Sequence, residues 1–390
     1  MNKMNNAYGH SERVFGLDRV RVLAILVVFF FHCARFFDHQ DWHVKNTELS
    51  AALTLFTRFI SLWIMPLFFF ISGISARYSL RHGVREYARS RVLRLLVPFL
   101  LGTFVVLAPA QVWVERVAHG GFSGGFLDFY PKYFEGWYGF GGNFAWMGLH
   151  LWYLEMLFIF SIITIPLFLF MKRRADARPS STSGLLGPLL WMAFPVTAAE
   201  LVSNLDPGLT GRRDWGGWPL LSHLAFFSAG YYAALRPAVL DRLASSWKLY
   251  LAGALAVTAF LAATFGTFRD GAVVSYVLAS TLLPAASILW IAAITGMGMG
   301  ALNFPGRMLE YGNEAVLPFY VLHQAVIVLI GFYIRDWNAG VAAKYVLLSG
   351  GSFIIIMLVY ELCIRRFRLT RFLFGMKAYH PPLPADADTS

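Results

Sequence analysis

Long apolar stretches, separated by short polar segments, dominate the pattern of the chain. A transmembrane helix needs about 20 mainly apolar residues, and about ten stretches approach that length. They lie at residues 20–37, 55–76, 92–114, 149–171, 185–203, 218–235, 247–266, 274–295, 315–335 and 343–363. The pattern therefore predicts an all-α, polytopic membrane protein with about ten transmembrane helices.

The composition supports this class and excludes several others. Of the 390 residues, 57% are hydrophobic and only 14% are charged, whereas a soluble domain carries about 25% charged residues. The two cysteines, Cys33 and Cys363, lie far apart and show neither metal-ligand nor redox spacing. We therefore expect no metal site, no disulfide framework and no disordered chain.

The net charge of +11 is distributed unevenly along the sequence. Lys and Arg concentrate in the N-terminal segment, in residues 77–94 and 172–184, and in the C-terminal tail. Intervening loops, such as 38–54 and 115–148, carry few. Positive loops face the cytoplasm, so we expect both termini inside, contacts of basic loops with the lipid bilayer, and no nucleic-acid partner.

This topology predicts three regions. We expect a cytoplasmic segment at residues 1–19, a transmembrane domain at 20–377, and a disordered cytoplasmic tail at 378–390. The segment Gly296–Gly300, which alternates glycine with methionine, is interpreted as a flexible cytoplasmic connection.

The first predicted span contains an arginine and a histidine that share one face. Arg21 and His32 are eleven positions apart, which is about three helical turns and about 16 Å. Asp18 lies one turn before Arg21 and is placed to orient its guanidinium. A neutral imidazole can act as a general base near pH 7, and a guanidinium suits phosphate. An interhelical hydrogen-bonding His and a boundary Arg are the structural alternative.

Two further predicted spans contain ionisable groups, which are functional candidates at membrane depth. Tyr320 and His323 are at i and i+3 and share a face; His323 is either a second site group or a packing residue. Glu155 lies about one turn deeper than Trp152, and either pairs with a His or Arg or contacts substrate. His150 and Trp152 also fit an aromatic belt at the membrane interface.

Arginines before the third predicted span form another candidate site. Arg91 and Arg94 are at i and i+3 and could bind a phosphate-bearing ligand, the alternative being ordinary inside charge. Glu361 is expected to pair with Arg365, four residues on. The aromatic-rich loop 115–148 either stacks on sugar rings or lies in the membrane interface.

In combination, these residues resemble the acyltransferase-3 family of bacterial integral membrane O-acyltransferases. The resemblance spans most of the chain and rests on Leu-Asp-x-x-Arg with Arg-x10-His (Arg21, His32), Phe-Phe-Phe-Ile-Ser-Gly at 68–73, Arg91 and Arg94, His-Leu-Trp-Tyr-Leu-Glu at 150–155, and Tyr-x-x-His-Gln at 320–324. The ending at 371–375 is similar to the branch associated with glucan succinylation.

The resemblance implies transfer of a succinyl or acetyl group from cytoplasmic acyl-CoA to a hydroxyl of a periplasmic or cell-surface glycan, in the bacterial inner membrane. It implies no tightly bound cofactor, with acyl-CoA as a donor substrate, and leaves room for a periplasmic partner protein. A polytopic secondary transporter is the alternative. The candidate catalytic residues are His32, Glu155 and His323, and the candidate substrate-binding residues are Asp18, Arg21, Arg91, Arg94, Trp152 and Tyr320.

Overall fold

The computed structural model describes residues 15–376 except 178–186, 207, 209–210 and 265–272. All regular elements in these residues are helices, apart from two isolated β-bridges. The predicted tail at 378–390 and most of the predicted segment at 1–19 lie outside the described residues. The chain forms two compact units, with boundaries inside four of its helices.

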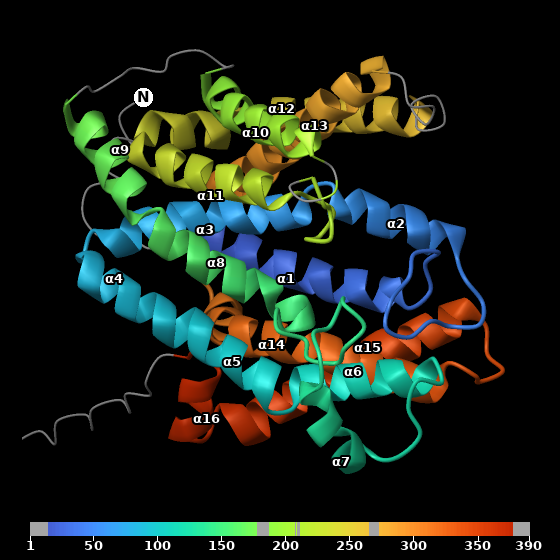
Figure 1. The fold of residues 1–390 in the computed structure, drawn as a ribbon. Coiled ribbons are helices and arrows are strands. Elements are labelled where there is room, and N and C mark those ends of the chain that lie inside the picture. The colour runs from blue at the N-terminus through green and yellow to red at the C-terminus, as the bar shows by residue number, and fades with distance from the viewer. Residues whose placement is uncertain (1–14, 178–186, 207, 209–210, 265–272, 377–390) are drawn as a thin grey trace, which may run out of the picture. The chain divides into compact units, whose positions relative to one another are not determined.

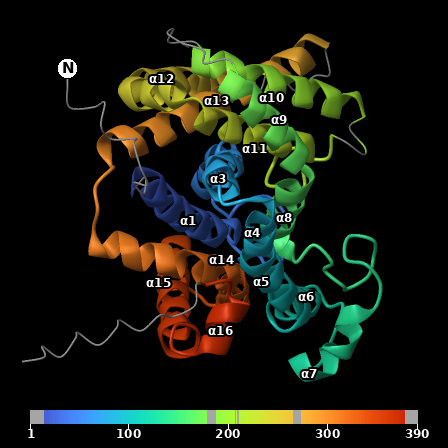
Figure 2. The same cartoon turned by 90° about the vertical axis from the view of Figure 1, so that its left-hand side faces the viewer.

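Unit 1 comprises residues up to 31, 51–88 and 159–313 (Figure 1). Its helices are α1 (Phe15–Arg35, whose last turn belongs to unit 2), α2 (Ala51–Ser61), α3 (Ile64–Leu80), α4 (Val84–Arg91, shared with unit 2), α9 (Ile165–Ala177), α10 (Gly187–Leu205), α11 (Leu220–Leu235), α12 (Pro237–Thr264) and α13 (Val273–Ala301). Helix α3 packs along α11, and α12 along α13, as both views show (Figure 2).

Unit 2 comprises residues 32–50, 89–158 and those from 314 onward. Its elements are the π-helical turn Val92–Leu96, α5 (Val97–Phe104), α6 (Leu107–Ala118), α7 (Phe126–Phe129), the 3-10 turns Pro131–Phe134 and Leu149–Leu151, α8 (Trp152–Ile163), α14 (Arg307–Ile334), α15 (Val341–Val359), the π-helical turn Tyr360–Ile364 and α16 (Arg368–Leu373). Of these, α8 and α14 extend into unit 1.

Six helical stretches are long and apolar enough to cross a membrane. They are Ala51–Leu80, Val84–Ala118, Pro237–Thr264, Ser280–Ala301, Arg307–Ile334 and Val341–Ile364. A seventh forms if Leu149–Ile163 and Ile165–Asp176, which meet at a bend of 55°, count as one span. The protein is therefore multi-pass and all-helical.

The expected ten spans are not confirmed in the described residues. Helices do occupy the other three predicted positions, as α1, α10 and α11. Helix α11 has 16 residues, which gives about 24 Å and falls short of the roughly 30 Å hydrocarbon core. The first two turns of helix α1 contain Asp18, Arg19 and Arg21, so its uninterrupted apolar part is short.

The prediction of a flexible connection at Gly296–Gly300 is wrong, because this segment lies inside α13. A Cβ atom at Gly296 would approach the carbonyl oxygen of Leu243 to 2.2 Å, and one at Gly298 would approach the carbonyl oxygen of Gly16 to 3.0 Å. These glycines allow the backbones of neighbouring helices to approach closely. The sequence signal that resembled a linker is therefore a helix-packing surface.

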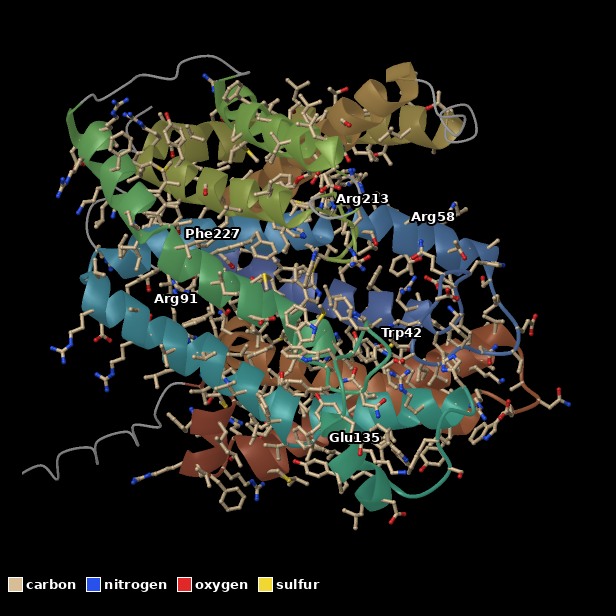
Figure 3. The ribbon with its side chains drawn as sticks, in the orientation of Figure 1. Trp42, Arg58, Arg91, Glu135, Arg213 and Phe227 are labelled. Carbon is tan, nitrogen blue, oxygen red and sulfur yellow. The ribbon has the colours of Figure 1, made fainter. Side chains whose placement is uncertain are left out.

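Unit 1 also contains a buried polar cluster. Glu200 is fully buried and accepts hydrogen bonds from Arg213 at 2.7 Å and from the hydroxyl of Ser222 at 2.5 Å (Arg213 in Figure 3). The neighbouring His223 lies 2.8 Å from the carbonyl oxygen of Trp215. Both carboxylate oxygens of Glu200 thus have a donor, which is the usual condition of a buried charge.

In unit 2, the segment after α1 is fixed by a buried carboxylate. Asp38 has no exposed surface and pairs with Arg35 at 2.6 Å and with Lys45 at 2.8 Å. Burial lowers the pKa of Lys45, and Asp38 partly opposes that effect. Arg35 also bonds to Gln40 and to the backbone of Asp41, so its guanidinium holds this segment in place.

Candidate functional site

Three histidines from separate elements meet in unit 2. His32 lies in the last turn of α1, His323 in α14, and His150 in the 3-10 turn before α8. Nε2 of His323 is 3.1 Å from Nδ1 of His32. The His150 and His323 ring centroids are 5.1 Å apart, with the rings nearly perpendicular. The sequence predicted His32 and His323 as candidates, and the structure brings them into contact.

The partners of these rings determine which nitrogens carry protons. Nδ1 of His323 is 2.5 Å from the carbonyl oxygen of Tyr320. A carbonyl oxygen only accepts, so Nδ1 of His323 must donate, and Nε2 of neutral His323 must accept. Nδ1 of His32 therefore carries a proton and donates to His323. This order leaves the lone pair of neutral His32 on Nε2.

His150 joins the site by contacts that sequence analysis missed. Its side chain is buried, its Nε2 is 3.1 Å from the carbonyl oxygen of Val321, and its backbone oxygen accepts a bond from the Tyr320 hydroxyl. Because Nε2 must donate to Val321, Nδ1 bears the lone pair, and it has no hydrogen-bond partner among the described residues. The aromatic-belt role at the membrane interface, which the sequence allowed, does not fit the buried position of this ring.

Glu155 lies on α8, whose first residue is Trp152. Its Oε2 is buried and has no hydrogen-bond partner in the part of the chain that the structure describes. The ion pair with a His or Arg that the sequence left open does not occur there. Tyr320, the other predicted binding residue of this region, uses its hydroxyl on the backbone of His150 and packs on Tyr153.

Asp18 and Arg21 lie in unit 1 and form the pair that their spacing predicted. Nη1 of Arg21 donates to Asp18 at 3.0 Å, and Nη2 donates to the hydroxyl of Ser75 at 2.9 Å. About a third of the Arg21 side chain stays exposed. The guanidinium is therefore oriented by two partners and still has accessible surface.

Arg91 and Arg94 lie where the helix changes type. Arg91 ends α4 (Figure 3), and Arg94 lies in the π-helical turn Val92–Leu96. The α-helical i, i+3 geometry does not hold through such a turn, and π-turns are frequent at functional sites. The backbone of Gly375 packs directly on Arg94, since a Cβ there would lie 3.0 Å from the Arg94 carbonyl oxygen. The sequence motif at 371–375 thus supports the segment that carries Arg94.

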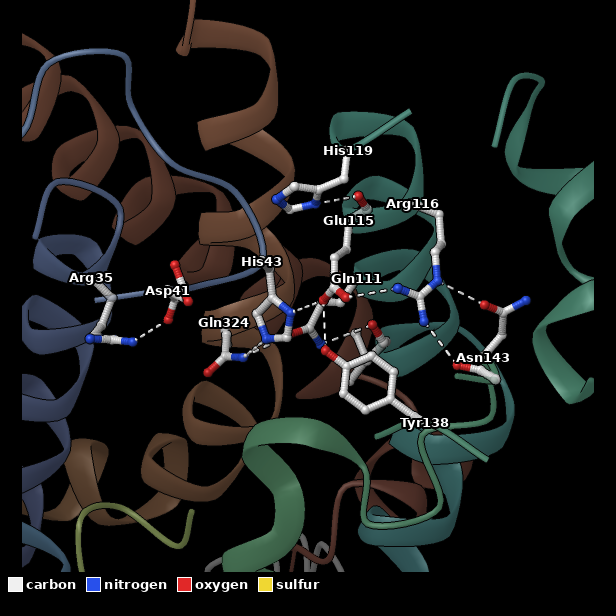
Figure 4. A network of polar contacts seen from close by, with 12 residues as sticks. Arg35, Asp41, His43, Gln111, Glu115, Arg116, His119, Tyr138, Asn143 and Gln324 are labelled. Atoms are coloured by element: carbon white, nitrogen blue, oxygen red, sulfur yellow. Dashed lines mark hydrogen bonds and ion pairs between the residues drawn. The ribbon is translucent and has the colours of Figure 1, made fainter. Parts of the chain in front are cut away.

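A second polar network surrounds a histidine that sequence analysis did not select (Figure 4). Nδ1 of His43 is 2.5 Å from Oε2 of Glu115, which also accepts a bond from the Tyr138 hydroxyl at 2.8 Å. The amide nitrogen of Gln324 is 3.1 Å from Nε2 of His43 and 3.1 Å from Oε1 of Gln111. Burial and the nearby Glu115 charge raise the pKa of Tyr138, which keeps this phenol a donor.

No signal in the sequence pairs His43 with Glu115, because the two residues belong to separate segments. In the sequence, Gln324 directly follows His323, and this adjacency links the network to a predicted site residue. Within the described ranges, no three His, Cys, Asp or Glu side chains are grouped to hold a metal ion.

Comparison with known proteins gives this site a context. The model of the acyltransferase-3 family, described as an acyltransferase domain, matches residues 14–361. Proteins named glucans biosynthesis protein C from Salmonella paratyphi B and Salmonella agona are 26% identical to this chain over 97% of its length and 97% of theirs. No solved structure matches the chain.

Proposed function

This chain belongs to the acyltransferase-3 family of membrane O-acyltransferases, and from that premise we propose that it transfers a succinyl or acetyl group from acyl-CoA to a hydroxyl of a glycan. The family supports an enzyme rather than the transporter considered as the alternative. The observation that best supports this proposal is the contact between His32 of α1 and His323 of α14. This contact supplies a neutral imidazole with a fixed tautomer.

His32 is the general base of the proposed reaction. Its Nε2 removes the proton from the attacking hydroxyl, whose oxygen forms a bond to the thioester carbonyl carbon. The carbon–sulfur bond then breaks, and the imidazolium returns the proton to the departing thiolate. The products are an ester and free CoA, so the step needs no oxidant and no covalent enzyme intermediate.

His323 positions His32 during this step. Its Nε2 accepts the proton of His32 Nδ1 at 3.1 Å, and the Tyr320 carbonyl in turn fixes His323. When His32 becomes charged, this acceptor stabilises the imidazolium, as a buried acceptor does behind a catalytic histidine. Glu155 is the second candidate for proton transfer, since its Oε2 is buried without a donor among the described residues.

Arg91 and Arg94 bind the phosphates of the donor, which guanidinium groups suit by charge and geometry. Arg21, oriented by Asp18 and Ser75, is a further candidate for such a contact, and Trp152 and Tyr320 remain candidates for substrate contacts. Segments rich in Lys and Arg, including 77–94, support the cytoplasmic side for this donor site. The acceptor then approaches from the opposite side of the inner membrane, and the names of the Salmonella relatives favour a glucan.

Two measurements test the proposal. Purified protein in liposomes, supplied with radiolabelled succinyl-CoA or acetyl-CoA and a gluco-oligosaccharide, should produce labelled ester. Mass spectrometry of periplasmic and surface glycans should show one ester mass that disappears when the gene is deleted. Unchanged glycans together with no labelled ester from either donor would refute this function.

A further inference from the structure

Trp42, labelled in Figure 3, lies near His32 of the candidate site and near His43 of the second network. Its ring centroid is 6.4 Å from that of His32 and 5.6 Å from that of His43. The side chain is partly exposed, and its indole N–H has no hydrogen-bond acceptor among the described residues. An aromatic face and an open donor therefore lie beside the proposed base.

The amide of Gln324 has one allowed orientation. Gln111 donates its own nitrogen to the carbonyl oxygen of Leu107, so Oε1 of Gln111 is an acceptor. Nδ1 of His43 donates to Glu115, so Nε2 of neutral His43 is an acceptor as well. The group of Gln324 that faces both acceptors must be its NH2. A flipped amide would set its oxygen against two acceptors.

This orientation turns the carbonyl oxygen of Gln324 away from the network, as Figure 4 shows. The residue is only 3% exposed, and no donor in the described residues reaches this oxygen. Because it is not one of the fully buried unpaired atoms, the oxygen keeps accessible surface and can accept a hydrogen bond from a ligand. The network of His43, Glu115 and Gln111 thus holds an accessible amide oxygen in the residue next to His323.

We propose that Trp42 and Gln324 form the acceptor-sugar subsite of the enzyme, an inference that rests on the proposed transfer to a glycan. A sugar offers an apolar ring face for the indole and hydroxyl donors for the amide oxygen, and a few placed polar groups beside an aromatic surface are typical of ligand sites. His43, Glu115 and Gln111 are positioning residues that act through Gln324. The subsite sets which hydroxyl reaches His32.

Steady-state kinetics on the full-length protein in liposomes test this subsite. Trp42→Leu and Gln324→Met should each raise the KM for a gluco-oligosaccharide about tenfold or more, the equivalent of one lost contact of about 1.4 kcal/mol. The KM for acyl-CoA should stay within about twofold. Trp42→Phe keeps an aromatic face and should fall between Trp42→Leu and wild type. Trp337→Leu, at an exposed tryptophan in the same unit, is the matched control and should change neither KM.

The positioning role has its own readout. His43→Ala should raise the acceptor KM and leave the donor KM unchanged, a split that a general loss of folded protein does not produce. An unchanged acceptor KM in Trp42→Leu and Gln324→Met, or a rise in the donor KM instead, would overturn the subsite while leaving the transferase intact.

Equilibrium dialysis separates this inference from the proposed function. Binding of labelled gluco-oligosaccharide without donor should be weaker for Trp42→Leu than for wild type and Trp337→Leu. If wild type transfers no acyl group, the proposed function fails, and this binding comparison still decides the subsite. Equal binding by all three proteins would contradict it.

Discussion

Two glutamates, one in each unit, show what separates a structural charge from a candidate reactive group. Glu200 in unit 1 receives a donor on each oxygen, from Arg213 and Ser222. Glu155 in unit 2 has one buried oxygen without a partner among the described residues. The residue type is the same in the two cases. The difference is whether the protein itself satisfies the group.

The histidines of the two units differ in what their rings contact. His223 in unit 1 stacks on Phe69, with ring centroids 4.6 Å apart, and bonds to a backbone carbonyl. His32 in unit 2 contacts another imidazole, and its partners leave a lone pair on Nε2. A buried ring held by packing contributes to stability, whereas a ring whose tautomer is set by a second ring is prepared for proton transfer.

Replacing the two histidines should give the largest contrast. His32→Ala should lower kcat by about 10²–10⁴-fold, the usual range for loss of a general base, with little change in thermal stability. His223→Ala should instead lower stability, because it leaves a cavity against Phe69. Acyl transfer per folded molecule and the melting temperature check this prediction. Full activity in His32→Ala would remove His32 from the chemistry.

Replacing the two glutamates should sharpen the comparison. Glu155→Gln should lower kcat by about 10–100-fold while leaving the melting temperature near that of wild type. Glu200→Gln should cost about 1–3 kcal/mol of stability, because Arg213 loses its buried partner, with normal kcat in the folded fraction. The reverse pattern, in which Glu200 controls kcat and Glu155 controls stability, would break the comparison.

Arg94 tests whether the arginines of unit 2 bind the donor. Arg94→Gln should raise the KM for acyl-CoA about tenfold, since a charge-assisted bond is worth about 1.5–3 kcal/mol. The KM for the glucan acceptor should not change. Gly350→Ala is a suitable control, because a Cβ there meets nothing within 4 Å. An unchanged donor KM in Arg94→Gln would exclude this contact.

The smallest effect is expected at an exposed ion pair. Glu361 and Arg365 are 3.1 Å apart, with 35% and 41% of their side chains exposed. Solvent screens such a pair, so Glu361→Gln should change stability by at most about 0.5 kcal/mol. A melting curve measures this change. A larger loss of stability would show that ion pairing contributes at the exposed surface as much as it does in the core.

The sequence predicted contacts that follow from one helix. The Asp18–Arg21 and Glu361–Arg365 pairs form as their spacing required. The polytopic helical class also followed from hydropathy. The contact between His32 and His323 did not follow from their spacing in the sequence. Each residue was a candidate because ionisable groups are rare at membrane depth.

Contacts between distant segments could not be predicted in this way. His43 lies in a connection that carries several polar residues, and nothing in its surroundings indicates Glu115, 72 positions away. The glycines at 296–300 resemble a linker in composition, and only the neighbouring backbones reveal their packing role. Long-range pairing and close helix contact both depend on the fold, which hydropathy and spacing do not specify.

The central claim is that His32 and His323 each have one fixed neutral tautomer, with the proton of each ring on Nδ1. Nitrogen NMR tests this claim most directly. Protein labelled with nitrogen-15 at its ten histidines, with His32 assigned by its absence in His32→Gln, should show neutral His32 protonated on Nδ1 and unprotonated on Nε2. A neutral His32 with its proton on Nε2 would contradict the account.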